Sequence, residues 1–366
     1  MKKIAIITFH APHNYGSNLQ AYALQNKVID LGYECDIINY RTSIQKEVYY
    51  IFTHRKGLKF RLKNLYTRLF IFKDRKKKYD KFENFINTKL KLTKEICTEE
   101  EFENIVKQYD SVISGSDQIW NLSIEDFDKV YMLPGDIKNK VTYAVSTGED
   151  LTLDYFTPEH TDLIQNIDHI SVRDSGTADL IEKIIGTRPN VVVDPTMLYD
   201  SEFYDQLVED EPIIKGEYIY LYTLGNDPEL LEIARKLSAK TGLPFYISHV
   251  SGTHYMFGTK KVLATGPVEF LNHIKYAKYV VVSSFHGTLF SILYHKQFWA
   301  YKPEKDNRKK EILTVLDLMD RSINIDNCNA KFDEKISEDK YSCVDEKLSN
   351  ARKNAVDFLS NALEGK

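Results

Sequence analysis

Apolar runs rich in β-branched residues alternate with amphipathic segments along most of the chain. Residues 3–9 predict a β-strand, 10–16 a polar loop, and the spacing of leucine, alanine and valine over 17–31 predicts a helix. Gly32 stands where a helix C-cap belongs, and 34–40 predicts the second strand of a βαβ unit. Further short strands are predicted at 111–114, 141–146, 169–173 and 191–194.

A charged segment over 200–216, with Pro212 and Gly216, predicts a linker between this series and a second one. The second series has predicted strands at 218–224, 244–248, 278–282 and 298–301, and predicted helices at 228–239, 268–277 and 287–294. Such alternation predicts an α/β fold with parallel sheets and helices on both faces. Two such domains would face a shared cleft.

The predicted domains are an N-terminal Rossmann-like domain over 1–205, a C-terminal Rossmann-like domain over 206–335, and a helical tail over 336–366. A basic helical insertion interrupts the first domain at about 44–95. The last helix, expected at 345–363, has few apolar positions and is expected to pack along the surface, back across the first domain.

Composition agrees with a soluble globular protein, since 43% of the residues are hydrophobic and 28% are charged. A length of 366 residues favours two domains over one. No apolar stretch approaches the roughly 20 residues of a membrane span. The first apolar run is interpreted as a strand rather than a signal peptide, and the four scattered cysteines give no disulfide framework. The cytoplasm is therefore the expected location.

The formal net charge of −4 hides a basic region in the insertion. Between Lys46 and Lys81, thirteen Lys and Arg residues face three acidic ones, an excess of ten that leaves −14 for the rest. Tyrosines and phenylalanines are interspersed with these cations. The favoured interpretation is a helical pair with its aromatic side chains toward the core and its lysines in solvent. Contact with an anionic membrane surface is the functional alternative, and no recognition motif supports nucleic acid.

Ser283-Ser284-Phe285-His286-Gly287-Thr288 is the most informative motif. It joins an apolar strand to a helix, which places His286 at the carboxyl edge of a sheet and at a helix N-terminus. Backbone amides there favour anions, and a histidine there can transfer protons near neutral pH. A purely structural role for His286 in capping the helix or bonding a loop stays open.

Other strand ends carry further candidate chemistry. The loop around Asn14 could hold an anion or a sugar, or form a simple turn. Asp117, Gln118 and Trp120 together suit a carbohydrate, although a tryptophan is usually a core residue. Arg173 offers a planar fork for a carboxylate or phosphate, with an Arg173–Asp174 contact as the structural alternative. The segment Asp194-Pro195-Thr196 is interpreted as a turn.

Several enzyme classes are disfavoured by missing motifs. The first loop lacks G-x-G-x-x-G, and no P-loop, G-x-S-x-G elbow or acidic metal-binding pair stands out. His249 and His254 are too weak a pair to indicate a metal site. No metal and no resident cofactor are expected.

Six motifs in order resemble the polysaccharide pyruvyl transferase family, over roughly residues 3–320. They are His13-Asn14-Tyr15-Gly16 with the following Leu19–Gln25, Ser114-Gly115-Ser116-Asp117-Gln118-Ile119-Trp120-Asn121, Tyr143-Ala144-Val145-Ser146, Ser171-Val172-Arg173-Asp174, Val193-Asp194-Pro195-Thr196 and Ser284-Phe285-His286-Gly287-Thr288. The resemblance implies a fold similar to the GT-B glycosyltransferases. It also implies transfer of pyruvate from phosphoenolpyruvate to a sugar of a cell-surface polysaccharide or its lipid-linked precursor, commonly as a ketal.

The resemblance also assigns roles to residues. It implies Arg173 and His286 as catalytic, donor-binding residues. Ser284, Gly287, Thr288 and Arg308 are the further candidates for the donor site. Asn14, Asp117, Gln118 and Trp120 are the candidates for the sugar acceptor. A lipid-linked acceptor would bring the enzyme to the inner face of the cell membrane, and no nucleic-acid partner is expected.

One position departs from the family pattern. Characterised members often have an arginine two residues before the histidine, where this chain has Ser284. Arg308 or Lys309 could replace that cation. A metal-independent glycosyltransferase of the same fold, and a non-catalytic glycan-binding or assembly protein, are the alternative functions.

Overall fold

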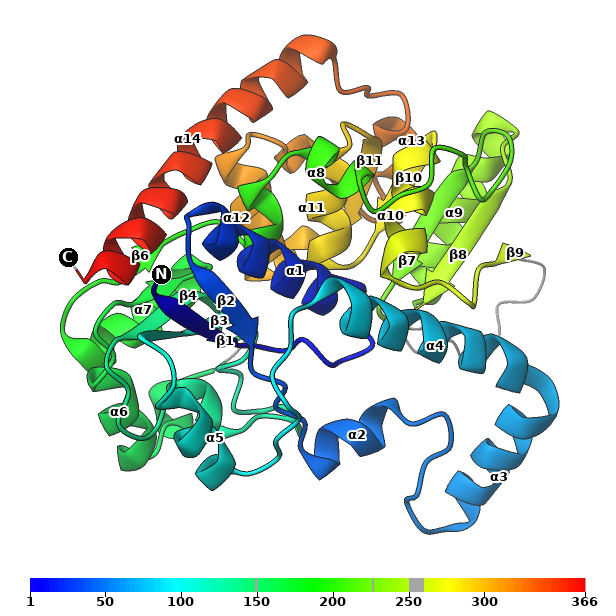
Figure 1. Ribbon diagram of the computed structural model, residues 1–366. Helices are drawn as coiled ribbons and strands as arrows, with labels where there is room; N and C mark the ends of the chain where they lie inside the picture. The colour runs from blue at the N-terminus through cyan, green and yellow to red at the C-terminus, as the bar shows by residue number, and fades with distance from the viewer. Residues whose placement is uncertain (149–150, 226, 250–259, 366) are drawn as a thin grey trace.

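The computed structural model describes residues 1–148, 151–225, 227–249 and 260–365. Within these residues, two six-stranded parallel sheets follow one another along the chain (Figure 1). The first sheet has the order β2-β1-β3-β4-β5-β6, and the second has the order β12-β11-β10-β7-β8-β9. The predicted α/β fold with two Rossmann-like, parallel sheets is confirmed.

The first sheet is formed by β1 (Lys3–Ile7), β2 (Glu34–Ile37), β3 (Ser111–Asp117), β4 (Lys140–Val145), β5 (Ser171–Val172) and β6 (Asn190–Val191). The second is formed by β7 (Ile219–Thr223), β8 (Phe245–His249), β9 (Lys260–Lys261), β10 (Tyr279–Val282), β11 (Gln297–Tyr301) and β12 (Ser322–Ile323). The α-helices are α1 (Tyr15–Asp30), α2 (Ser43–Tyr49), α3 (Leu58–Tyr66), α4 (Phe72–Lys89), α5 (Glu99–Val106), α6 (Pro158–Gln165), α7 (Ser175–Ile185), α8 (Ser201–Asp205), α9 (Pro228–Thr241), α10 (Pro267–Tyr276), α11 (Phe285–Leu293), α12 (Asn307–Val315), α13 (Cys328–Lys331) and α14 (Glu338–Glu364). A π-helical turn, η1 (Thr67–Ile71), joins α3 to α4, and a 3₁₀ turn, η4 (Pro195–Leu198), follows β6.

Each sheet has a point where the chain reverses the direction in which it adds strands. In the first sheet, β2 lies on one side of β1 and β3 on the other. In the second sheet, β8 and β10 flank β7 in the same way. Loops that leave such a point diverge, which opens a crevice at the carboxyl ends of the strands.

The hydrophobic core is continuous through both sheets, because one cluster contains residues of each. Tyr15, at the start of α1, is central to this junction. Its ring stacks on Phe270 of α10, with centroids 4.7 Å apart and an interplanar angle of 10°. Its hydroxyl lies 3.1 Å from the hydroxyl of Ser248 on β8. A single aromatic side chain therefore fastens the first helix of one unit to the sheet of the other.

The C-terminal helix crosses between the two units, as expected, but it is longer than predicted. It begins at Glu338 rather than at residue 345. Arg352 donates hydrogen bonds to the carbonyls of Met197 and Tyr199, and Asn139 donates to the carbonyl of Ala362. The segment predicted as a plain linker contains α8, which buries Tyr204.

The basic insertion contains α2, α3, η1 and α4. The second half of α4 packs as predicted and buries Phe82, Phe85 and Ile86. The prediction is wrong for α3 and η1, because α3 buries none of its residues and the side chain of Phe70 is 70% exposed. These elements project away from both sheets (Figure 1). Among the described helices, none combines the length and hydropathy that crossing a bilayer requires.

Candidate functional site

A cleft of about 240 Å³ opens where the carboxyl ends of both sheets face each other. The first unit contributes residues that follow β1 and β3, and the second contributes residues of β7 and the segment after β10. Tyr49 of α2 adds a wall from the insertion. The complete lining is Phe9, Pro12, Asn14, Ser17, Tyr49, Asp117, Gln118, Ile124, Asp126, Tyr222, Leu224, Ser284, Phe285, His286 and Arg308.

The N-terminus of α1 forms one side of the cleft. Asn14 is the N-cap, and its side-chain oxygen accepts a hydrogen bond of 3.0 Å from the amide of Gly16. Gly16 lies directly against the imidazole of His286, so that a Cβ at this position would collide with the ring. The absence of a side chain at Gly16 is thus what allows the two units to meet around the histidine.

The N-terminus of α11 forms the opposite side. Ser284 is its N-cap and accepts a hydrogen bond of 2.9 Å from the amide of Gly287. The serine that departs from the family pattern therefore has a local structural role, which an arginine could not fill. Gly287 and Thr288 are buried and are not among the residues that line the cleft. Their predicted direct contact with a donor is not supported by this placement.

Four side chains form a charge cluster at and beneath the floor of the cleft: Asp117, Arg173, Asp194 and His286. Nη1 of Arg173 lies 3.0 Å from Oδ2 of Asp194 and 3.5 Å from Oδ1 of Asp117. Nε2 of His286 lies 3.4 Å from Oδ2 of Asp194, and the hydroxyl of Ser17 donates to Asp117 at 2.7 Å. The side chain of Arg173 is 1% exposed and that of His286 is 12% exposed. His286 therefore reaches the cleft, whereas Arg173 lies below it.

The charges of the cluster determine its protonation. Burial by itself would raise the pKa of Asp194, but His286 and Arg173 outweigh burial and lower that pKa far below its usual range. The pKa of Asp117 is also lowered, since Arg173, His286 and Ser17 together overcome the effect of burial. Burial opposes the charge of Arg173, but Asp117 and Asp194 raise its pKa. Both carboxylates are therefore ionised at neutral pH.

Arg173 retains hydrogen-bonding capacity. Its Nε and Nη2 are buried and have no hydrogen-bond partner among the described residues. Its guanidinium carbon lies 4.8 Å from the ring centroid of Phe285, which lines the cleft. These donors do not reach the cleft, since the side chain of Arg173 is 1% exposed and is not part of the lining.

Arg308 is the cation on the wall of the cleft. Its guanidinium carbon lies 5.6 Å from the centroid of Phe285, and Asp306 holds it through two hydrogen bonds of 3.0 and 3.1 Å. The side-chain amide of Gln118 also contacts this guanidinium. Lys309, the other candidate, is buried and donates to the carbonyls of Ser283 and Tyr301. Of the two cations, Arg308 is therefore the one available to a ligand.

The acceptor candidates divide into two groups. Asn14, Asp117 and Gln118 line the cleft together, as predicted. Trp120 does not, and the prediction that it contacts a sugar is wrong. Its indole is fully buried in the core of the first unit and donates a hydrogen bond of 3.0 Å to the carbonyl of Tyr131.

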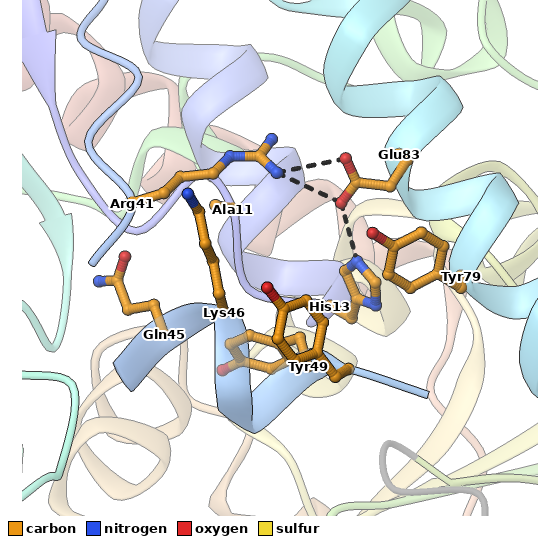
Figure 2. A pocket seen from close by; sticks show the side chains of 9 residues that line it. Ala11, His13, Arg41, Gln45, Lys46, Tyr49, Tyr79 and Glu83 are labelled. Carbon is orange, nitrogen blue, oxygen red and sulfur yellow. Dashed lines mark hydrogen bonds and ion pairs between the residues drawn. The ribbon is translucent and has the colours of Figure 1, made fainter. Parts of the chain in front are cut away.

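A smaller pocket of about 40 Å³ adjoins the cleft and shares Tyr49 with it (Figure 2). Glu83 of α4 accepts from Nε2 of His13 at 3.1 Å and from Nη1 of Arg41 at 3.2 Å. Figure 2 shows these three side chains meeting above Tyr49 and Tyr79. The network attaches the insertion to the loop that follows β1.

Sequence reasoning missed Asp194 and Tyr49. Asp194 follows a strand end, which is the same signal that identified the other candidates, but Pro195 favoured a turn. The turn is present, since Asp194 also accepts from the amide of Thr196 at 3.0 Å. Tyr49 had no signal beyond its place among the aromatic residues of the insertion. Among the described residues, no group of three or more His, Cys, Asp or Glu is arranged to hold a metal ion, and His254 lies outside the described residues.

Comparison with known families gives one match, to the family model described as polysaccharide pyruvyl transferase, over residues 14–304. That range contains every strand of the chain from β2 to β11 and all the residues of the charge cluster. No curated protein sequence matches significantly.

Solved structures share the fold at low sequence identity. MnaA of S. aureus, in a co-structure with UDP, is 12% identical, with 94% of this chain and 91% of that chain covered and a TM-score of 0.54. UDP-GlcNAc 2-epimerase from Methanocaldococcus jannaschii is 10% identical, with 92% and 94% covered and a TM-score of 0.48. The glycosyltransferase SnogD from Streptomyces nogalater is 10% identical, with 99% of each chain covered and a TM-score of 0.43. The similarity to MnaA extends over both units and shows the shared fold.

Proposed function

The chain belongs to the polysaccharide pyruvyl transferase family, and is therefore a transferase of polysaccharide biosynthesis. From this membership we propose that it moves the pyruvyl unit of phosphoenolpyruvate onto a sugar residue of a cell-surface polysaccharide or its lipid-linked precursor, forming a ketal. The proposed reaction takes place on the cytoplasmic side and needs no metal or resident cofactor.

The observation that supports this function best is the combination of His286 and Arg308 in one cleft, with Arg173 below its floor. Phosphoenolpyruvate carries a carboxylate and a phosphate on the same enol carbon. Planar guanidinium groups match both anions, and the N-terminal amides of α1 and α11 add positive potential from the two sides. In the proposal, Arg308 binds one anionic group at the wall, and the N-terminal amides of α1 and α11 face the other. Arg173 supports the floor from below, where it pairs with Asp117 and Asp194.

His286 is the proposed proton carrier. A proton must reach the methylene carbon of the donor, so that the neighbouring carbon becomes open to attack by a sugar hydroxyl. Phosphate then leaves, and a second hydroxyl of the same sugar closes the ketal. Overall, one hydroxyl proton ends on the new methyl group and the other on the released phosphate. Asp194 is a positioning residue in this scheme, because its Oδ2 lies 3.4 Å from Nε2 of His286 and orients the imidazole.

The acceptor is proposed to lie on the side of the first unit. Asn14, Asp117 and Gln118 offer amide and carboxylate groups that can hydrogen-bond sugar hydroxyls. Asp117 is held in place by Ser17 and Arg173, so its orientation does not depend on the ligand. Of the four predicted acceptor residues, these three remain in the proposal and Trp120 does not.

Calorimetric titration with phosphoenolpyruvate tests the donor site. The wild type is expected to bind, and Arg308→Ala to bind at least tenfold more weakly, a loss of about 1.4 kcal/mol or more. His286→Ala is expected to bind the donor but to release no phosphate when acceptor glycan is added. Arg235→Ala is a matched control, because Arg235 pairs with Glu232 on the exposed surface of α9. Chelation of divalent cations with EDTA should leave the rate unchanged.

Two other results would favour the alternative functions. Thermal stabilisation by a nucleotide-sugar, with none by phosphoenolpyruvate, would favour a metal-independent glycosyltransferase. Glycan binding without phosphate release under any donor condition would favour a non-catalytic glycan-binding or assembly protein. Either result would overturn the proposed function.

A further inference from the structure

Within the insertion, α3, η1 and α4 form a helical hairpin. Its first arm, α3 with η1, exposes an unusual amount of apolar surface. In α3 and η1, Leu58, Leu62, Leu65, Leu69 and Phe70 have exposed fractions of 73%, 57%, 53%, 64% and 70%. We call these five residues the leucine face. Monomeric soluble proteins seldom expose a contiguous group of large apolar side chains, and such groups commonly mark an interaction site.

The leucine face has the geometry of one side of a helix. Leu58, Leu62, Leu65 and Leu69 follow spacings of four, three and four residues, which place their side chains in one stripe. Figure 1 shows α3 far from both sheets, at the tip of the hairpin that α4 completes. The described elements leave this stripe uncovered.

The charges beside this stripe indicate what covers it. Leu58–Ile71 contains Lys59, Arg61, Lys63 and Arg68 and no acidic residue. From Arg55 to Lys78 there are eleven Lys and Arg residues, and Asp74 is the only acid. A second copy of the chain docked on the leucine face would bring two cationic flanks together, and like charges across such an interface oppose pairing. An anionic surface would instead attract the exposed cations of this stretch, among which the buried Lys78 does not count.

Hydrogen bonds join the hairpin to the segment that precedes α3. Asn64 of α3 donates to the carbonyl of Thr53 at 2.8 Å and accepts from the amide of Thr53 at 3.1 Å. Arg75 of α4 donates to the carbonyl of Ile51 at 3.0 Å. At the other end of the same segment, Tyr49 lines the cleft. The leucine face and a wall of the cleft are therefore joined by a short, hydrogen-bonded stretch of chain.

We propose that α3 and η1 dock the protein on an anionic lipid bilayer, with the leucine face inserted at the boundary of headgroups and acyl chains and the neighbouring cations on the lipid phosphates. A basic helix with an apolar stripe lies in the plane of the interface and does not cross it. This docking stands on the surface of the hairpin alone. That it brings a membrane-bound acceptor near the cleft rests on the proposed function.

The test uses the full chain and sedimentation with large unilamellar vesicles. Vesicles of phosphatidylcholine with about a third phosphatidylglycerol should bind the wild type at low salt, and pure phosphatidylcholine vesicles should bind at least tenfold less. Salt at about 0.5 M should weaken the binding because it screens the cations. Leu62→Ser with Leu65→Ser should lose at least tenfold in binding. Leu153→Ser with Val315→Ser removes two exposed apolar side chains elsewhere and should bind as the wild type does.

Two further measurements separate folding, insertion and catalysis. Leu62→Trp should show a blue shift in emission on anionic vesicles, since the native Trp120 and Trp299 are buried and give a constant background. The leucine variants should keep the thermal midpoint and the phosphoenolpyruvate affinity of the wild type, so that a failure of docking is distinct from a failure of the donor site.

Three results would overturn the proposal. The first is no difference between anionic and neutral vesicles at low salt. The second is unchanged vesicle binding by the leucine variant, because binding would then need only charge. The third is a concentration-dependent dimer of the wild type that the leucine variant abolishes, without vesicle binding by either protein, because a second copy would then cover the leucine face.

Discussion

The charge cluster beneath the cleft and the insertion hairpin use similar residue types in opposite surroundings. In the cluster, the single cation Arg173 is buried between Asp117 and Asp194, and each charge has an assigned partner. On the hairpin, the stretch from Arg55 to Lys78 contains eleven cations and one acid, and nine of these cations are exposed. The cluster contacts the first and second units at once, whereas the tip of the hairpin contacts neither.

The two regions differ in how much a charged pair contributes to stability, because one is buried and the other is exposed. Removing a partner from a buried ion pair leaves a desolvated charge without compensation, which is strongly destabilising. An exposed pair is screened by water and salt and contributes little. The cluster should therefore tolerate almost no substitution, while substitution of the exposed side chains of α3 and η1 should have little effect on stability.

The largest effect is expected for Asp194→Asn. The substitution keeps the shape of the side chain but leaves Arg173 with a single carboxylate partner and His286 with none at this position. The free energy of unfolding should fall by about 3–5 kcal/mol, measured by chemical denaturation. On the hairpin, Asp80→Asn removes the exposed partner of Lys76 and should change that free energy by no more than ~0.5 kcal/mol. Equal changes in the free energy of unfolding for the two variants would contradict the difference between the buried cluster and the exposed hairpin.

Gly16→Ala sharpens the comparison without changing a charge. The added methyl group collides with the imidazole of His286 and should displace it from Asp194. The rate of phosphate release should fall by about 100-fold, since a small misplacement of a catalytic group can have an effect of that size. Gly176→Ala is the matched control, because its Cβ would meet its nearest neighbour, Oδ1 of Asp174, at an ordinary 3.5 Å. Full activity of Gly16→Ala would mean that His286 can move without consequence.

The pH dependence of stability should also separate buried from exposed groups. Burial lowers the pKa of His10 from 6.5 to about 4. Between these values only the unfolded chain takes up a proton at this histidine, so stability falls as the pH falls from about 6.5 toward 4. From pH 7 to pH 5, the wild type should lose ~2 kcal/mol more than His10→Gln does.

The smallest effect is expected for Leu62→Ala on the hairpin. Because this side chain is 57% exposed, its truncation should change the free energy of unfolding by about 0.5 kcal/mol or less. Leu19→Ala provides the contrast in the core, where the side chain is fully buried and its loss should cost about 2–5 kcal/mol. A large loss for Leu62→Ala would show that another part of the chain covers the leucine face.

The fold was largely predictable because its signals are local. Alternating strands and helices required parallel sheets, and polar residues at the strand ends located Asn14, Asp117, Gln118 and His286 at one cleft. Trp120 was not predictable, because the direction of its indole depends on the carbonyl of Tyr131 and on the core that surrounds both. The importance of Asp194 was hidden in the same way, since its partner His286 is 92 residues away in the sequence.

The surroundings of the insertion were not predictable from the sequence either. The spacing of its leucines predicts an amphipathic helix, but whether anything covers the apolar stripe depends on the path of the neighbouring segments. The second half of α4 packs against the rest of the protein, whereas α3 buries none of its residues. Local pattern therefore identified the helix and misjudged its surroundings.

The continuous core determines how much of the first unit can fold while the chain is still being synthesised. Tyr15 can contact Phe270 and Ser248 only after most of the second unit has left the ribosome. Lys2 and Asn139, beside the first sheet, bond carbonyls of Leu363 and Ala362 near the very end of the chain. The first unit therefore cannot be completed during synthesis in the usual N-terminal-first sequence, and its final closure waits for the last turn of α14. A nascent chain of this protein should expose one open side of its first sheet until α14 has been synthesised.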